Sequence, residues 1–142
     1  MIQYFNSEYA IKVHDDIINI SGGLFGIMKE GQLESILDFV QSDDYYPTFE
    51  EKACYLFYSI NKGHCFNDGN KRSSVALCAY FFEINSLDFC VTRFIGEMEN
   101  IAVDVADNRI DRDLLFEIIT SILSEDDYNE ELKLKIALAK GL

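Results

Sequence analysis

The spacing of apolar residues along the chain predicts helices almost throughout. Residues 7–20 carry apolar side chains every three or four positions, and the pattern stops at a pair of glycines. After a turn-rich stretch, residues 22–31, the same spacing returns over residues 33–40. Apolar residues at this spacing lie on one face of a helix, which can then be buried. Two amphipathic helices are therefore predicted in the first third of the chain.

A third and a fourth predicted helix flank a short polar loop. Thr48 and Glu51 stand at the spacing of a capping box, in which Thr48 accepts a hydrogen bond from the backbone of Glu51. The helix that follows ends at Gly63. Residues 70–85 are apolar nearly all round, which is expected of a central, buried helix. The loop at residues 64–69 is therefore predicted to lie between two helix ends.

The rest of the chain completes an all-α prediction. Helical segments are expected at about 93–106, 112–123 and 126–140, whereas residues 89–91 could form a strand stub or a loop. A chain of 142 residues with one proline and no linker or repeat is typical of one domain. We expect residues 1–142 to form a single-domain helical bundle around a buried central helix, with the polar loop at that helix's N-terminus.

Charge and composition exclude several classes of function. The chain has 12 basic and 25 acidic residues, a formal net charge of −13. This charge repels phosphate backbones and anionic lipid headgroups, so neither direct nucleic-acid binding nor membrane binding is expected, whereas a basic partner segment would be attracted. The sequence shows no signal-peptide pattern and no apolar run of membrane-spanning length. A cytoplasmic location is the expectation.

The cysteines and one histidine offer little chemistry of their own. The four cysteines are Cys54, Cys65, Cys78 and Cys90. They form no CxxC pair and have no histidine at metal-ligand spacing, so we expect reduced, mostly buried thiols. Nothing near Cys65 except His64 argues for thiolate activation. His14, inside the first predicted helix, we interpret as an amphipathic-face or surface residue.

The loop combines the groups that phosphoryl transfer needs. A helix N-terminus offers unpaired backbone N–H groups and a partial positive charge, so it binds phosphate, and Gly69 lets a ligand approach the backbone closely. Lys71 and Arg72 occupy the first helical turn, where the dipole disfavours cations unless an anion neutralises both. Asp68 is a carboxylate available to Mg²⁺, and His64 suits general-base work near neutral pH.

Each of these residues taken singly has an ordinary structural explanation. A histidine after a helix is most often a polar loop residue, Asp68 with Gly69 is a common turn, and Lys71 with Arg72 a solvated pair. Their joint occurrence within residues 64–72 is what predicts a site. Phe66 alternates with the polar positions and is expected to turn into the core, where it would fix the loop.

Residues 64–72, His-Cys-Phe-Asn-Asp-Gly-Asn-Lys-Arg, match the Fic/Doc pattern HxFx(D/E)(G/A)N(G/K)R at every specified position. Segments 22–26, 31–35 and 81–85 resemble corresponding parts of the death-on-curing (Doc) members of that family. The resemblance covers about residues 7–89. It implies an all-α Fic fold with Mg²⁺ as cofactor and ATP or another nucleoside triphosphate as co-substrate.

The resemblance also implies roles for individual residues. His64 would be the base, Asp68 would hold Mg²⁺, and Asn70 and Arg72 would contact phosphates. Lys71 stands where family members that transfer AMP typically have glycine, whereas Doc-type members with lysine transfer the terminal phosphate. The resemblance therefore favours a protein kinase over an AMP transferase.

A Doc-like protein is further implied to be the toxin of a toxin–antitoxin system. Its protein target would be a translation elongation factor of the Tu kind, and a small antitoxin would neutralise it. Two other functions stay open: an AMP transferase on the same fold, and a non-catalytic module that binds only a nucleotide or a partner. The C-terminal helices, about 93–140, include a tail that could cap the fold, contact a second copy or regulate the site.

Overall fold

The structure, a computed structural model that describes all 142 residues, confirms the all-α prediction and contains no strand. Its α-helices are α1 (Ser7–Ser21), α2 (Glu30–Phe39), α3 (Phe49–Lys62), α4 (Asn70–Ile84), α5 (Val91–Ala106), α6 (Arg112–Ser124) and α7 (Glu130–Ala139). A short 3₁₀-helix, Asp88–Cys90, leads directly into α5, so residues 89–91 form neither the strand stub nor the loop that the sequence left open. No helix is long and apolar enough to cross a membrane.

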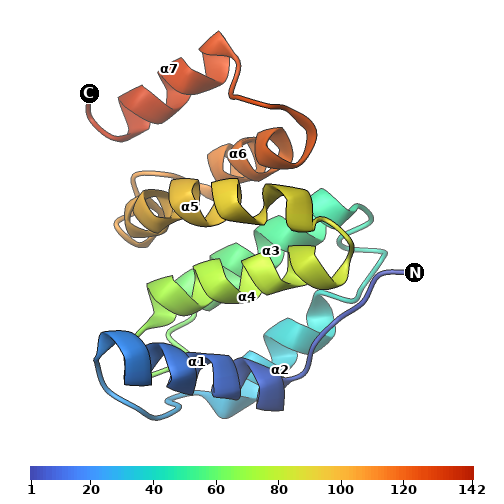
Figure 1. The fold of residues 1–142 in the computed structure, drawn as a ribbon, viewed down its shortest axis with the longest axis vertical. Helices are drawn as coiled ribbons and strands as arrows, with labels where there is room; N and C mark the ends of the chain where they lie inside the picture. Colours follow the sequence, from blue (N-terminus) through green and yellow to red (C-terminus); the bar gives the residue numbers. More distant parts are fainter.

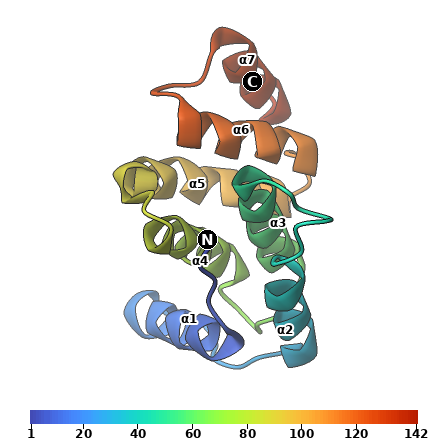
Figure 2. The same cartoon turned by 90° about the vertical axis from the view of Figure 1, so that its right-hand side faces the viewer.

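The helices stack in layers around α4 (Figures 1 and 2). α1 and α2 form one end, α3 and α4 follow, and α5, α6 and α7 lie in succession towards the other end. α4 packs against α1, α3 and α5, and buried apolar side chains from all seven helices form one cluster. Phe82 of α4 lies edge-on to Phe94 of α5 with ring centroids 4.6 Å apart. The predicted central position of α4 is confirmed.

Side-chain caps fix where several helices begin. The Thr48 hydroxyl accepts a hydrogen bond from the Glu51 backbone at 3.1 Å, which is one half of the predicted capping box. Asn129 caps α7 in the same way, through the backbone N–H of Leu132 at 2.8 Å. The last helix therefore begins at Glu130, four residues later than predicted, because the cap lies beyond the acidic run.

One lysine lies in the core, which the sequence pattern did not predict. Lys52 of α3 is completely buried, and its ammonium group donates to the Val40 carbonyl at 3.1 Å and pairs with Asp43 at 2.9 Å. A buried ammonium needs such partners because burial otherwise disfavours its charge. Lys52 thereby ties the α2–α3 connection to α3. The four cysteines are buried and unpaired with one another, which confirms that prediction.

Three segments that are distant in sequence meet at one end of the layers. The carboxyl end of α1, the α1–α2 connection (residues 22–29) and the α3–α4 loop (residues 63–69) lie together at the left of Figure 1. A hydrogen bond of 3.0 Å from the Asn67 backbone N–H to the Gly26 carbonyl joins the connection and the loop. The predicted functional residues lie at this end.

Candidate active site

Gly63 and His64 turn the chain out of α3. Gly63 ends the helix by donating its backbone N–H to the Ser59 carbonyl at 2.8 Å, and a Cβ at this position would lie 2.5 Å from the same oxygen. Only glycine fits here. His64 then adopts a φ of 49°, in the left-handed region that few non-glycine residues occupy. His64 is exposed, so a substrate can reach it.

The inner side of the loop is anchored by stacked rings. Cys65 and Phe66 are completely buried, which confirms the predicted anchoring role of Phe66. The Phe66 ring stacks on the imidazole of His14 with centroids 4.0 Å apart and an interplanar angle of 4°. Nε2 of His14 lies 2.6 Å from the Asp68 carbonyl oxygen, to which a protonated Nε2 donates. His14 therefore holds both ends of the segment that carries Asp68.

The interpretation of His14 as an amphipathic-face or surface residue was wrong. Its exposed fraction is 1%, and it forms the buried stripe of α1 together with Ala10 and Ile18. These three residues are spaced four apart, which is the signal that could have identified His14 as inward-facing. Burial also raises the pKa of the Cys65 thiol, which removes the case for an activated thiolate.

Asn70 clamps the loop with its whole side-chain amide. Its Oδ1 accepts from the Phe66 backbone N–H at 3.1 Å, and its Nδ2 donates to the Phe66 carbonyl at 3.0 Å. Gly69, with a φ of 76°, forms the N-cap that places Asn70 as the first residue of α4. The side-chain amide is held by the Phe66 backbone, and Asn70 also offers a phosphate its backbone N–H, which has no partner within the helix.

Asp68 is held as a carboxylate at the same helix end. One of its oxygens accepts from the Leu24 backbone N–H at 3.0 Å and the other from the Gly69 N–H at 2.8 Å. These backbone donors lower the pKa of Asp68 below its usual value, and the charge of Arg72 lowers it further. The carboxylate is exposed enough to bind a cation, since 42% of its side chain is accessible.

The two cations of the first turn of α4 differ in their surroundings. Arg72 donates through Nη1 to the Ser21 hydroxyl at 2.6 Å and to the Gly22 carbonyl at 2.8 Å, while Nη2 lies 3.8 Å from Asp68. Lys71 is exposed and forms no ion pair or side-chain hydrogen bond. The structure thus bonds Asp68 to Gly69 and pairs it with Arg72, and it ties Asn70 to Phe66. His64 and Lys71 are exposed beside this group.

The α1–α2 connection packs on the loop through its backbone. Met28 and Lys29 both donate N–H groups to the Cys65 carbonyl, at 2.7 and 3.0 Å. Gly23 has a φ of 123°, and a Cβ there would lie 2.5 Å from the Asp68 carboxylate. This glycine permits the close approach that lets the neighbouring Leu24 N–H reach Asp68. Leu24, Phe25 and Met28 themselves are exposed.

A groove adjoins the first turn of α4 and was not predicted. It has a volume of about 540 Å³ and lies where α1, α4 and α5 meet. Lys71 and Arg72 line it together with apolar side chains such as Val75 and Val103, and Glu99 contributes the one carboxylate. The residues that line the groove are spread along the sequence from position 17 to position 103, so the groove exists only in the folded chain.

Comparison with known proteins agrees with this geometry. Residues 4–82 match the model of the Fic/DOC family, and this span contains the loop, the α1–α2 connection and most of α4. The match covers more than half of the chain, and the protein belongs to the Fic/DOC family.

The chain is also similar to a characterised member of that family. It is 32% identical over 90 residues to the protein kinase doc of Escherichia phage P1, which covers 61% of this chain and 71% of the relative. The family resemblance expected from residues 64–72 is therefore confirmed.

Proposed function

We propose that this protein is a Doc-like kinase with toxin activity, which transfers the terminal phosphate of a nucleoside triphosphate to a hydroxyl group of a target protein. The observation that carries the proposal is the pair Lys71 and Arg72 at the amino end of α4, beside the groove. Cations at the positive end of a helix dipole are unfavourable, and while Arg72 is partly offset by Asp68, the ammonium group of Lys71 has no anionic partner, so a bound anion would stabilise this end. A triphosphate is such an anion.

The groove suits the rest of the nucleotide. Its volume of about 540 Å³ falls in the range of small-molecule sites, and its apolar walls can enclose a planar base. The phosphates would then lie over the first turn of α4, where the backbone N–H groups of Asn70 and Lys71 are free. Arg72 makes no hydrogen bond through Nε or Nη2, so it can contact a phosphate without leaving Ser21.

Asp68 fits the expected Mg²⁺. Its ionised, partly exposed carboxylate is the hard oxygen ligand that Mg²⁺ takes, while no group of three or more acidic, histidine or cysteine side chains could hold a metal unaided. The remaining ligands would be phosphate oxygens and water. When bound, Mg²⁺ neutralises charge that develops on the phosphates.

His64 would act as the general base. Its neutral imidazole accepts the proton of the acceptor hydroxyl while that oxygen attacks the terminal phosphorus. The bond from this phosphorus to the bridging oxygen breaks, and the nucleoside diphosphate leaves. The exposed position of His64 allows a hydroxyl on a large protein to reach it. Leu24, Phe25 and Met28 are exposed apolar side chains on the neighbouring connection and would contact that protein.

Lys71 favours phosphate transfer over AMP transfer. Its side chain occupies space that glycine would leave open to the phosphate chain, so the nucleotide would bind in the reversed sense, with its terminal phosphate towards His64. By the same Doc-like reasoning the target is elongation factor Tu, the setting is the cytoplasm, and a small antitoxin with a basic segment neutralises the toxin. The net charge of −13 favours such a segment.

The test is phosphate transfer with two labels. ATP labelled with ³²P at the γ position, or in parallel at the α position, is incubated with Mg²⁺, elongation factor Tu and either the wild type or His64→Ala. We expect label from the γ position alone and its loss in His64→Ala. Lys12→Ala serves as a control substitution at an exposed position of α1, and it should transfer label like the wild type.

The other outcomes separate the alternatives. Label from the α position would make the protein an AMP transferase. Absence of transfer in the wild type, together with a toxic effect that survives His64→Ala, would favour a non-catalytic module and would refute the proposal.

A further inference from the structure

One charged side chain of the groove beside α4 has no role in the proposed function. Glu99 of α5 lines this groove, is exposed, and forms no ion pair or side-chain hydrogen bond. The other two charged residues of the groove, Lys71 and Arg72, are cations and belong to the facing helix, α4. What Glu99 can bind depends on where its carboxylate lies relative to these cations.

A buried asparagine fixes the register of α5 against α4. Asn61 of α3 donates through Nδ2 to the Ala102 carbonyl at 3.0 Å and to the Ser74 hydroxyl at 3.5 Å, so Ala102 and Ser74 lie at the same level. The chain reverses between the two helices, and α5 runs back towards the loop (Figure 1). Glu99 precedes Ala102 by three residues and therefore lies on the side of this level that is away from the loop.

The two cations lie on the loop side of the same level. Lys71 and Arg72 precede Ser74 by three and two residues, so five to six residue positions separate them from Glu99 along the helix axes. At the rise per residue of an α-helix this separation is about 7–9 Å. Glu99 is therefore too far along the groove to neutralise the cations directly, which agrees with the absence of an ion pair.

The order of side chains along the groove matches the order of groups in a nucleotide. The cations lie nearest the loop, the carboxylate of Glu99 follows, and Ile95 lies one turn further along α5. A nucleoside triphosphate carries its phosphates, its ribose and its base in this sequence. With the phosphates on the cations, the ribose comes next to Glu99 and the base next to Ile95.

The ribose hydroxyls suit a carboxylate. The 2′ and 3′ hydroxyls are adjacent donors, and an ionised glutamate offers two oxygen atoms that only accept. Hydrogen bonds to an ionised acceptor are about twice as strong as those between neutral groups. Dinucleotide-binding folds use an acidic side chain on the ribose in the same way.

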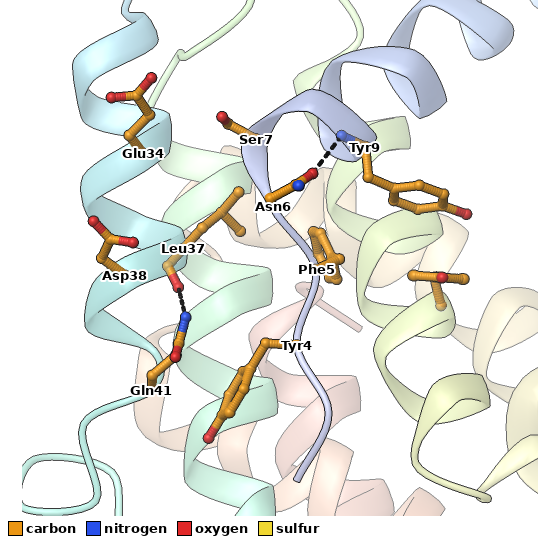
Figure 3. Close-up of a pocket in the computed structure, with 10 residues that line it drawn as sticks. Tyr4, Phe5, Asn6, Ser7, Tyr9, Glu34, Leu37, Asp38 and Gln41 are labelled. Carbon is orange, nitrogen blue, oxygen red and sulfur yellow. Dashed lines mark hydrogen bonds between the residues drawn. The ribbon is translucent and has the colours of Figure 1, made fainter.

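The larger cavity of the molecule suits a nucleotide less well. It has a volume of about 630 Å³ and lies between the N-terminal arm and α2 (Figure 3). Glu34 and Asp38 contribute carboxylates to it, and no Lys, Arg or His lines it. Its Tyr9 and Tyr80 rings stack on one another with centroids 4.3 Å apart. The cavity thus offers no cation to a phosphate, whereas the groove offers two.

We propose that Glu99 is a specificity-determining residue, which accepts hydrogen bonds from the 2′ and 3′ hydroxyls of the ribose and so selects ribonucleotides over deoxyribonucleotides. This inference rests on the proposed function, since it requires that the groove holds the nucleotide. A deoxyribonucleotide would place a C–H group where the carboxylate needs a donor. A site built to bind a hydroxyl group rejects an analogue that lacks it, because the polar group of the site is then left unpaired.

Nucleotide binding tests the role of Glu99. Calorimetry gives the dissociation constants of ATP, 2′-deoxy-ATP and 3′-deoxy-ATP for the full chain with Mg²⁺ and no protein substrate. We expect the wild type to bind ATP about tenfold more tightly than either deoxynucleotide, as loss of a hydrogen bond to a charged group implies. Glu99→Ala should bind the three nucleotides within about twofold of one another.

The ratio of dissociation constants is the readout because all three nucleotides carry the same charge. Removing any carboxylate from this acidic protein changes the attraction of ATP in general, and this change cancels in the ratio. Glu125→Ala is the control, because it removes the same charge from an exposed, unpaired position on the α6–α7 connection, outside the groove. It should keep the wild-type preference for ATP.

The outcomes separate this inference from the proposed function. Equal wild-type affinities for ATP and the deoxynucleotides, or a preference that persists in Glu99→Ala, would overturn the role of Glu99. Transfer of the γ label to elongation factor Tu would then still support the kinase. A wild type that binds no ATP and transfers no label would overturn the nucleotide site and, with it, this inference.

Discussion

His14 offers the sharpest test of how the loop is supported. It makes two separable contacts with the loop, the ring stack on Phe66 at 4.0 Å and the hydrogen bond to the Asp68 carbonyl at 2.6 Å, while its Nδ1 lies 3.4 Å from the Asp15 carboxylate. His14→Phe keeps an aromatic ring on Phe66 but leaves the partly buried Asp68 carbonyl without this donor. Leaving such a group unpaired costs about 1–3 kcal/mol of the free energy of unfolding. His14→Ala removes the ring too, and the total loss should reach about 2–5 kcal/mol.

The assay is urea unfolding followed by circular dichroism, with Lys12→Ala as a control on the exposed side of α1. The order of stability should be wild type, then His14→Phe, then His14→Ala, and the control should stay within about 0.5 kcal/mol of the wild type. If the proposed function is correct, both His14 variants also lose phosphate transfer, because the supported carbonyl belongs to Asp68. A His14→Phe protein as stable and as active as the wild type would refute the supporting role.

Two further predictions concern the connection and the buried thiols. Gly23→Ala should destabilise the protein and lower Mg²⁺-dependent nucleotide binding, measured by calorimetry, because a Cβ at a φ of 123° would lie 2.5 Å from the Asp68 carboxylate. Gly96→Ala, on the open face of α5, is the control: it should leave nucleotide binding unchanged and raise stability by about 0.5–1 kcal/mol, as alanine does in place of glycine within a helix. Burial raises the pKa of the Cys54 thiol to about 11, although the nearby charge of Arg112 acts to lower this pKa. Because the folded pKa is the higher one, the thiol's contribution to stability is complete below the unfolded pKa of about 8.5 and is lost as pH rises towards 11. Urea midpoints should therefore fall between about pH 8.5 and 11, and the fall should be smaller in Cys54→Ala; equal slopes would contradict the shift.

Much of the helical architecture could be predicted from local sequence. Apolar spacing and capping residues identified the helices, and the errors were confined to their ends, as at α7, where Asn129 rather than the acidic run sets the start. That residues 1–142 form one domain stays a prediction. The loop was identifiable because its chemistry is compressed into nine neighbouring residues, 64–72.

What could not be predicted depends on contacts between distant segments. His14 lies 54 residues before the carbonyl that it supports, and Lys52 finds its partners in the α2–α3 connection. The groove needs α1 and α5 on either side of α4. Periodicity reports which face of a helix is buried, and it says nothing about which segment covers that face. The spacing of Ala10, His14 and Ile18 in the sequence showed that His14 could lie on the buried face of its helix, but not that it would contact Asp68.

The loop residues that match the Fic/Doc pattern fall into two groups according to what their side chains contact. Phe66 stacks on His14 of α1, Asn70 bonds through its side chain to the Phe66 backbone, and Asp68 accepts from two backbone N–H groups before any ligand arrives. His64 and Lys71 are exposed and make no side-chain hydrogen bond. A site arranged in this way is preorganised, so binding does not have to order it. If the proposed function is correct, substitutions of Phe66 or Asn70 therefore lower stability and phosphate transfer together, while those of His64 or Lys71 remove transfer from a protein whose stability is unchanged.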